Sequence, residues 1–227
     1  MRKFLIILVS VFIWNTAMAQ EVPVKENVEG VKSEALNDLK LAADLVRYGY
    51  KQQEALPLIQ ALEIINNTDS QPLEAETDGT LADTSVSAGK SGYITLDTKQ
   101  ILADAKKFSN GDKSLDKLLA KVEKETGRST RGAVGGPCKD YAAVNAYSSY
   151  TWTCSFVASS LAEVAVLGDG DTDLDLYIYD SNGNLIASDT DYSDECYVSW
   201  VPKWTGKFYI KVVNRGGVYN RYVILTN

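Results

Sequence analysis

The first half of the chain carries apolar residues at intervals of three and four, which is the period of an amphipathic helix. Between residues 28 and 65 these positions are Val31, Ala35, Leu39, Ala42, Val46, Ala55, Ile59, Leu62 and Ile65. A second pair of helices is predicted behind Asp97 and Asp112, each of which can cap the N-terminus of a helix. The pattern predicts a packed helical hairpin and then a further helix pair that ends near Gly127.

After Pro137 the period changes to two, which is typical of strands with one buried face. The alternating apolar positions are Tyr150, Trp152, Cys154, Phe156, Val164, Val166, Leu174, Leu176, Ile178, Phe208, Ile210 and Val212. Turn sequences at 181–184, 205–206 and 216–217 separate these runs, as in an all-β sandwich. The predicted fold class is α+β with more than one domain: an N-terminal helical region followed by an antiparallel, jelly-roll-like β-sandwich.

Composition sets the predicted boundaries. The helical region spans residues 20–127 and contains an acidic loop at 67–92, which is rich in Thr, Ser, Asp, Glu and Gly. Residues 128–137 contain several glycines and form a predicted linker. The sandwich then takes residues 138–227, which is enough chain for one small domain with its own core.

Residues 1–19 have the features of a secretory signal peptide. Arg2 and Lys3 precede an apolar run, and Ala17-Met18-Ala19 is a small-residue cleavage pattern. The apolar run is too short to span a bilayer as a helix. We therefore expect an exported protein, periplasmic or extracellular, with no transmembrane anchor in the mature chain.

Charge and histidine content exclude several classes of function. The net charge is −7, and it becomes −9 when the predicted signal is removed. Such a chain does not favour nucleic-acid phosphates, which are bound by clustered Lys and Arg, so no nucleic-acid partner is expected. The sequence has no histidine, which excludes Ser-His and Cys-His nucleophiles, histidine-bound zinc and imidazole acid/base catalysis.

The three cysteines, Cys138, Cys154 and Cys196, allow at most one internal disulfide. Strand alternation turns Cys154 and Cys196 inward. We therefore predict a Cys154–Cys196 bridge in preference to a pairing of Cys138 with either of them.

An acidic block occupies the middle of the predicted sandwich. No Lys or Arg lies between Lys139 and Lys203, whereas ten acidic residues lie between Glu163 and Glu195. The run GDGDTDLDLYIYD at 168–180 begins like a calcium-binding EF-hand loop. It does not continue as one, because Leu174 replaces the required glycine and Asp180 the required glutamate.

The run instead divides into two parts. Asp169 and Asp171 lie in a glycine-flanked loop, and Asp173 and Asp175 lie on the outer face of the strand that follows. Like charges so close together invite a cation or backbone N–H partners, and calcium takes six to eight oxygen ligands. A second acidic loop near residue 190 could complete a site. The candidate calcium ligands are Asp169, Asp171, Asp173, Asp175, Asp189 and Asp191; the alternative is a solvated loop with side-chain-capped turns.

A pair of these carboxylates could also serve a glycoside hydrolase, which needs one carboxyl group with a raised pKa in a substrate cleft. Carboxylates on the turns of a small sandwich are usually well solvated. We therefore expect no enzyme, and a carboxylate-dependent glycoside hydrolase is an alternative.

The run DTDLDLYIYDSNGNLIASDTD, followed by VSWVPKWTGKFYIKVVNRGGVYNRYVILTN, resembles the bacterial pre-peptidase C-terminal domain, a secreted β-sandwich module. The matching features are D-x-D-L-D at 171–175, the Asn182-Gly183 turn, W-x-P at 200–202, the T-G motif at 205–210 and the closing tyrosines of 219–222. The resemblance covers about residues 150–227 and implies a sandwich and calcium binding. In that family the module usually follows a peptidase or another catalytic domain. Here a helical region without histidine precedes it, so peptidase activity is not carried over.

Tyr177 and Tyr179 continue the outer face of the acidic strand, and with Trp204 they are the candidate ligand contacts. Exposed aromatic rings can stack on sugars or hold an extended peptide, although tyrosines are also common as half-buried strand residues. The predicted function is an exported, non-catalytic binding or interaction module with a protein or glycan partner. The alternative is an accessory subunit of a secreted hydrolase system.

Overall fold

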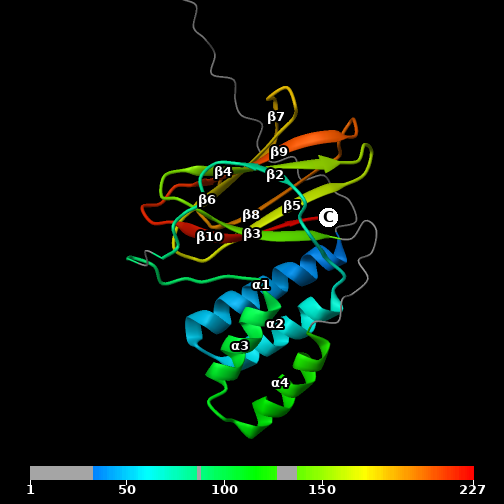
Figure 1. The fold of residues 1–227 in the computed structure, drawn as a ribbon. Coiled ribbons are helices and arrows are strands. Elements are labelled where there is room, and N and C mark those ends of the chain that lie inside the picture. Colours follow the sequence, from blue (N-terminus) through cyan, green and yellow to red (C-terminus); the bar gives the residue numbers. More distant parts are fainter. Residues whose placement is uncertain (1–32, 86–87, 127–136) are drawn as a thin grey trace, which may run out of the picture.

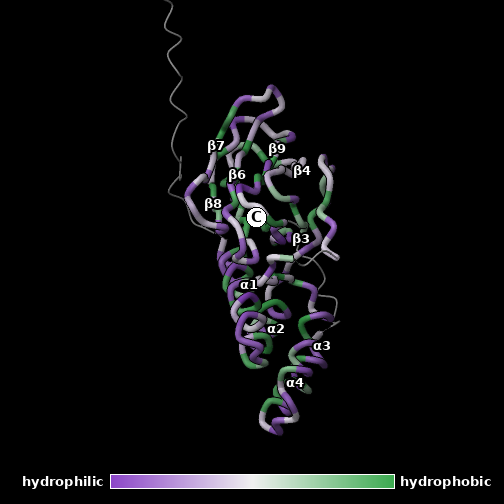
Figure 2. Tube along the Cα trace, turned by 90° about the vertical axis from the view of Figure 1, so that its left-hand side faces the viewer, coloured by the Kyte–Doolittle hydropathy of each residue, from purple (hydrophilic) through white to green (hydrophobic). Residues whose placement is uncertain are grey.

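The structure, a computed structural model, describes residues 33–85, 88–126 and 137–227. The predicted signal peptide, and the predicted linker apart from Pro137, lie outside the described residues. Helices at one end and two stacked β-sheets at the other form three layers (Figure 1). A view from the side shows the same order, with β6 and β9 at one end of the stack and α4 at the other (Figure 2). The predicted order of a helical region and then a β-sandwich is confirmed.

The described residues contain four helices, and the last two begin where the sequence predicts them. The four are α1 (Glu34–Gln52), α2 (Ala55–Asn67), α3 (Thr98–Phe108) and α4 (Lys113–Glu125). The carboxylate of Asp97 accepts hydrogen bonds from the backbone N–H groups of Lys99 and Gln100, at 2.9 and 3.2 Å. Asp112 caps α4 in the same way, so both predicted caps are confirmed. Within the described ranges, no helix combines the length and hydropathy needed to cross a membrane.

The two sheets have five strands each, and we call them the inner and the outer sheet. The inner sheet has the order β1 (Gln71–Pro72), β3 (Cys138–Val144), β10 (Asn220–Thr226), β5 (Ala162–Gly168) and β8 (Glu195–Trp200). The outer sheet has the order β2 (Glu76–Asp78), β4 (Ser149–Phe156), β9 (Gly206–Asn214), β6 (Leu174–Tyr179) and β7 (Leu185–Asp189). Neighbouring strands are antiparallel, except that β1 and β3 are parallel.

The segment at 67–92, predicted as an acidic loop, contributes an edge strand to each sheet. Strand β1 pairs with β3 through Gln71 and Pro72, and β2 pairs with β4 through three residues from Glu76 to Asp78. These strands are too short and too polar to show a period of their own. Their pairing is therefore set by the neighbouring strand rather than by local propensity.

The inner sheet is buried on both faces. On β5, Val164 and Val166 face the core between the sheets, whereas Ala165 and Leu167 face the helices. Helix α1 packs against β10 and β5 on that second face. Burial of a full aliphatic side chain contributes roughly 1.5–3 kcal/mol, so the helical layer and the sandwich stabilise one another. The helices cover the inner sheet, and no described residues form a layer over the outward face of the outer sheet.

The predicted Cys154–Cys196 disulfide is not formed in the structure. Both side chains face the sandwich core, as the alternation predicts, but Cys154 lies on the outer sheet and Cys196 on the inner sheet. Cys154 lies instead near Cys138 of the inner sheet, and the two line the same groove. The Cys196 thiol donates instead to the carbonyl oxygen of Leu174, at 3.1 Å.

Candidate functional site

The outward face of the outer sheet is a candidate site because it carries aromatic and basic side chains in a regular arrangement. Strand β9 runs through the middle of this sheet. Its residues Phe208, Ile210 and Val212 face the sandwich core, so Lys207, Tyr209, Lys211 and Val213 face outward. We call this surface the open face.

Strand register aligns these side chains in rows across the open face. One row consists of Thr151, Lys211 and Tyr177, and the next consists of Thr153, Tyr209 and Tyr179. Directly opposed residues on paired strands have Cβ atoms about 4.5–5.5 Å apart. Hydroxyl, ammonium and aromatic groups therefore form one continuous surface.

Two of the predicted ligand contacts lie side by side on this face. The rings of Tyr177 and Tyr179 have centroids 6.3 Å apart and an interplanar angle of 22°. The Tyr177 hydroxyl donates to Asp175 at 3.0 Å and accepts from an Arg215 guanidinium nitrogen at 3.0 Å. Burial, together with the hydrogen bond to Asp175, raises the pKa of Tyr177 above its ordinary value. The ring is thus held in place before any ligand arrives.

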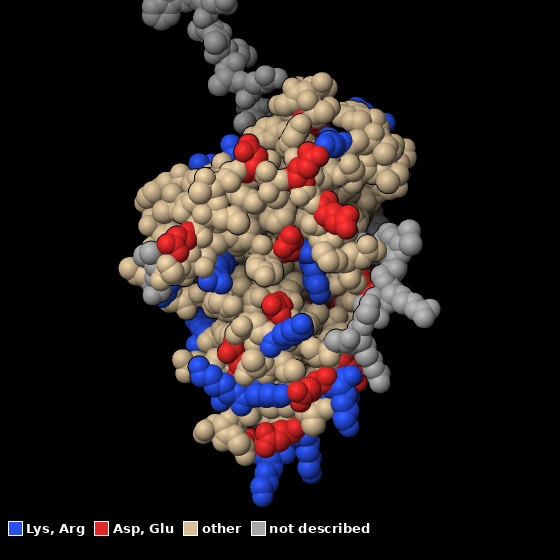
Figure 3. Space-filling view, viewed as in Figure 1, with Lys and Arg blue, Asp and Glu red and all other residues tan. Residues whose placement is uncertain are grey.

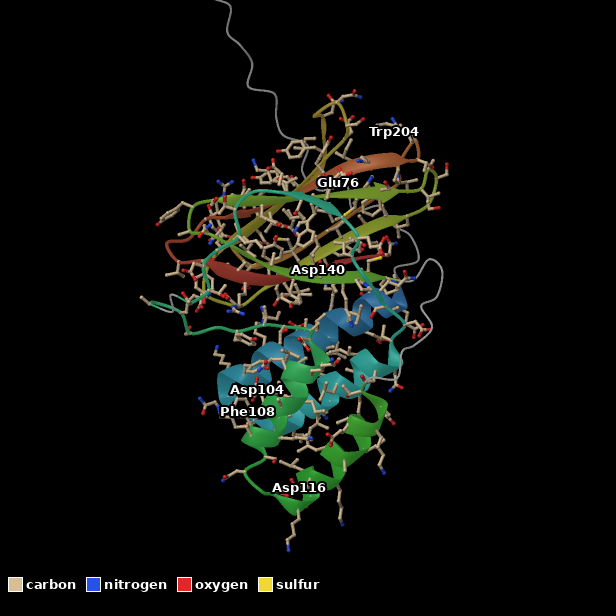
Figure 4. All side chains as sticks on the ribbon, viewed as in Figure 1. Glu76, Asp104, Phe108, Asp116, Asp140 and Trp204 are labelled. Atoms are coloured by element: carbon tan, nitrogen blue, oxygen red, sulfur yellow. The ribbon has the colours of Figure 1, made fainter. Side chains whose placement is uncertain are left out.

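The third predicted contact, Trp204, does not join this pair. Its ring stacks on Phe208, with centroids 5.7 Å apart and an interplanar angle of 17°. Trp204 precedes β9 and sits at the rim of the sandwich (Figure 4). It therefore lies apart from the two tyrosines, which are in register with residues 209–211 further along β9.

A groove beside the two tyrosines encloses about 530 Å³. Besides Tyr177 and Tyr179, it is lined by Tyr147, Ser148, Ser149, Lys211, Val213 and Arg215. Tyr147 is 77% exposed and has a backbone φ of 51°. Its N–H donates to the carbonyl oxygen of Gly216 at 3.1 Å, which fixes it against the turn between β9 and β10. Three phenol groups and two cations thus converge on one groove.

The cations of the open face differ in whether they form an ion pair with a carboxylate. Lys207 lies 2.9 Å from a carboxylate oxygen of Glu76, which Figure 4 marks on the outer sheet. Arg215 Nε donates to Asp175 at 2.6 Å. Lys211, which lies between them in the sequence, makes no ion pair with any described residue.

The predicted calcium ligands fall into separate groups. Asp169 and Asp171 both bind Lys90, whose Nζ lies 2.5 and 2.6 Å from their carboxylate oxygens. The same ammonium donates to the carbonyl oxygen of Tyr219 at 2.8 Å and lies 4.6 Å from the centroid of its ring. The Lys90 side chain is only 6% exposed, and those of the two aspartates are 0% and 5% exposed. We call this arrangement the Lys90 clamp.

Backbone groups complete the clamp. Asp171 accepts from the N–H groups of Ser91 and Gly92, at 3.0 and 2.9 Å, and Asp169 accepts from the N–H of Arg221 at 2.9 Å. Burial raises the pKa of Asp169. Burial also acts to raise the pKa of Asp171, but the hydrogen bonds from Lys90 and Ser91 outweigh it and lower that pKa to about 2.

The other four predicted ligands, Asp173, Asp175, Asp189 and Asp191, lie elsewhere, on the outer sheet and the loops next to it. Asp175 binds Arg215, Asp189 accepts from the N–H of Tyr197 at 3.0 Å, and Asp191 accepts from the hydroxyl of Ser193 at 2.7 Å. Asp173 keeps a buried carboxylate oxygen without a hydrogen-bond partner among the described residues. In the described part of the chain, no three acidic or cysteine side chains are arranged to hold a metal ion. Calcium binding itself stays a prediction.

The residues that sequence reasoning missed are the cations that neutralise the acidic block. Lys90 binds the first loop, Arg215 binds Asp175, and Arg47 binds both Asp194 and Glu195. A signal was present in the sequence, because a block of ten acids without Lys or Arg must take its counter-charges from other segments. The sequence did not show which segments supply them.

Comparison with known proteins gives no family for this chain. No protein-family profile matches it, and no curated protein is similar to it. Among solved structures, it is similar to the pre-peptidase C-terminal domain of collagenase from Bacillus anthracis, at 10% identity over 39% of this chain and 87% of that chain, with a TM-score of 0.35.

Two further structures are similar over about the same share of this chain. One is PliG of Aeromonas hydrophila, a periplasmic inhibitor of g-type lysozyme, at 11% identity over 40% of this chain and 84% of that chain, with a TM-score of 0.32. The other is a carbohydrate-binding module from Cellvibrio mixtus lichenase 5A in complex with cellotriose, at 12% identity over 41% and 87%, with a TM-score of 0.26. Likeness at this level assigns neither family nor ligand.

Proposed function

We propose that this chain is an exported, non-catalytic module that binds a glycan on the open face of its outer sheet. The observation that carries the proposal is the Tyr177–Tyr179 pair, in which hydrogen bonds hold the Tyr177 hydroxyl and which lies beside a groove rich in hydroxyl and cationic groups. An aromatic platform that needs no rearrangement on binding loses little conformational entropy.

The arrangement suits sugar rings in particular. One face of a pyranose ring carries C–H groups that pack on an aromatic ring, while its hydroxyls need donors and acceptors at the edge. The two nearly parallel tyrosine rings offer the first, and Ser148, Ser149 and Thr151 offer the second. Binding sites of this kind combine apolar contact area with a few placed polar groups.

The same face favours binding over hydrolysis. A glycoside hydrolase needs two carboxyl groups on opposite sides of the bond to be cut, one of them able to give up a proton. On the open face Glu76 is bound by Lys207, and Asp175 is bound by Arg215 and Tyr177. These two carboxylates already serve as partners of neighbouring side chains, which leaves Asp78 without a second unpaired carboxylate on the described strands of this face to complete an acid/base pair.

The test is affinity electrophoresis of the purified protein, without residues 1–19, against a panel of soluble polysaccharides. Tyr179→Ala is expected to weaken binding roughly 30-fold, which corresponds to about 2 kcal/mol for a central aromatic contact. Tyr177→Phe keeps the ring and should weaken binding far less.

The matched control is Tyr48→Ala on α1, because Tyr48 is an exposed tyrosine of the helical layer. The proposal fails if no polysaccharide retards the wild type, or if Tyr48→Ala and Tyr179→Ala weaken binding equally. Circular dichroism of each variant confirms that the fold is retained.

A further inference from the structure

We infer that the ligand of the open face is an acidic polysaccharide, whose sugars carry carboxylate groups, and that Lys211 recognises this carboxylate. The inference rests on the proposed function and adds the chemical class of the glycan. It follows from the position of Lys211 and from the charges around it.

Of the two cations that line the groove, Lys211 is the one without a carboxylate partner among the described residues. The cations on either side of it have carboxylate partners: Lys207 on β9 binds Glu76, and Arg215, which follows β9, binds Asp175. Lys211 itself has no ion-pair partner in the described ranges, and it lines the groove with the three tyrosines. An ammonium group that meets a carboxylate in a partly enclosed groove forms a charge-assisted hydrogen bond, which is stronger than a neutral one.

The register places this ammonium beside the aromatic platform. Lys211 is directly opposite Tyr177 on β6 and opposite Thr151 on β4. Cross-strand neighbours lie about 5 Å apart at Cβ, so a sugar ring on Tyr177 has its substituents within reach of the Lys211 side chain. A carboxylate on that sugar would meet Lys211 without any movement of the sheet.

Nearby acids do not cancel this charge. Asp78 shares the row of Lys211, but β4 stands between them, and two strand spacings amount to about 10 Å. The negative charge of the whole chain acts over longer distances, and physiological salt screens it beyond about 8 Å. Acids and cations balance on the open face as a whole, but the groove itself is lined by Lys211 and Arg215 and by no carboxylate of the described residues.

The strands beneath the groove also favour a glycan over an acidic peptide. An extended peptide gains affinity by adding a strand to an exposed sheet edge, where backbone groups are unpaired. Strands β9 and β6 are internal strands of the outer sheet, and each pairs on both sides. The face therefore offers side chains and no backbone ladder.

The experiment compares polygalacturonate with the same polymer after complete methyl esterification, which removes the charge and keeps the sugar. At low salt the wild type should bind the acidic form at least tenfold more tightly, and 0.5 M NaCl should abolish most of the difference. Lys211→Gln should lose about tenfold in affinity for the acidic form and leave affinity for the ester unchanged. Lys211→Arg should restore most of the loss.

The matched control is Lys117→Gln on α4, which changes the net charge equally. Its neighbour Asp116 marks the far end of the helical layer, and Lys and Arg already gather over that end of the molecule (Figures 3 and 4). Equal binding of both polymers, or equal effects of Lys117→Gln and Lys211→Gln, would overturn the inference while glycan binding stands. Failure of the acidic polymer to bind also overturns it; the proposed function then stands only if a neutral polysaccharide binds in a Tyr179-dependent manner.

Discussion

Replacing Lys90 by methionine tests the Lys90 clamp, which joins the segment before α3 to the loop before β6. Methionine keeps much of the length and apolar stem of lysine but removes the ammonium. Two carboxylates, 0% and 5% exposed, then remain side by side without their shared cation. Breaking a buried ion pair by removing one partner costs about 3–5 kcal/mol.

The structure places the expected cost near the lower end of this range. Asp171 keeps its backbone partners Ser91 and Gly92, and Asp169 keeps the N–H of Arg221. Asp169 can also take up a proton, since burial already raises its pKa. We therefore expect a loss of about 3 kcal/mol at pH 8, which lowers the melting temperature by about 6–12 °C for a chain of this size.

The pH dependence of this loss follows from Asp169. Without the ammonium its folded-state pKa rises further, so the folded variant binds a proton more tightly than the unfolded chain does. The stability that such a group contributes is present at low pH and is lost as pH rises through its folded-state pKa. Lys90→Met should accordingly lose less stability at pH 5 than at pH 8, as measured by urea unfolding.

The matched control is Lys106→Met. Lys106 lies 2.6 Å from Glu123, the same distance as between Lys90 and Asp171, but the two side chains are 45% and 51% exposed. An exposed pair of this kind contributes less than about 1 kcal/mol. Equal effects of Lys90→Met and Lys106→Met would refute the reasoning, because burial is the difference between the two pairs.

Three further predictions concern the acidic loops and the thiols. The pKa of Asp171 is lowered to about 2, against about 3.9 in the unfolded chain, so its contribution to stability is complete above about pH 4 and is lost as pH falls through 2. In Asp171→Asn the free energy of unfolding should therefore fall less steeply between pH 4 and pH 2 than in the wild type. An unchanged slope would contradict this. Calcium at 100 times its Kd should stabilise the wild type by about 2.7 kcal/mol if the predicted site exists; a melting midpoint that calcium and EDTA leave unmoved rejects the site, and a rise that survives Asp173→Asn rules out that residue as a ligand. Burial raises the pKa of Cys154 to about 12, so this thiol should resist iodoacetamide at pH 8 until the protein unfolds. Non-reducing peptide mapping that finds Cys154 joined to Cys196 would contradict the unbridged thiols of the structure.

The elements with a strong local signal were predictable. Asp97 and Asp112 each precede an amphipathic run, and the side chain of each caps the helix that follows. The alternation of Leu174, Leu176 and Ile178 likewise identified the core face of β6, and with it the outward direction of Tyr177. In these cases the same few residues carry both the pattern and the packing.

The features that depend on distant partners were not predictable. Strand β2 is only Glu-Thr-Asp, and it is a strand because β4 offers an edge to pair with. Lys90 lies 79 residues before Asp169 in the sequence, so nothing local indicates that its ammonium binds there. The sequence indicated Tyr177 as a ligand contact but not the groove beside it. That groove also needs Lys211 from β9 and Tyr147 from the turn before β4.

The central position of β10 has a consequence for the order in which the chain can fold. Residues 220–226 lie between β3 and β5, so the inner sheet cannot close until this segment has joined it. Until then the apolar face of α1 has no complete sheet to pack against. Contacts so distant in sequence slow folding, so we expect the inner sheet to form late. During that interval the unpaired strands and the apolar face of α1 are exposed, so the chain depends on protection from aggregation until the inner sheet has closed.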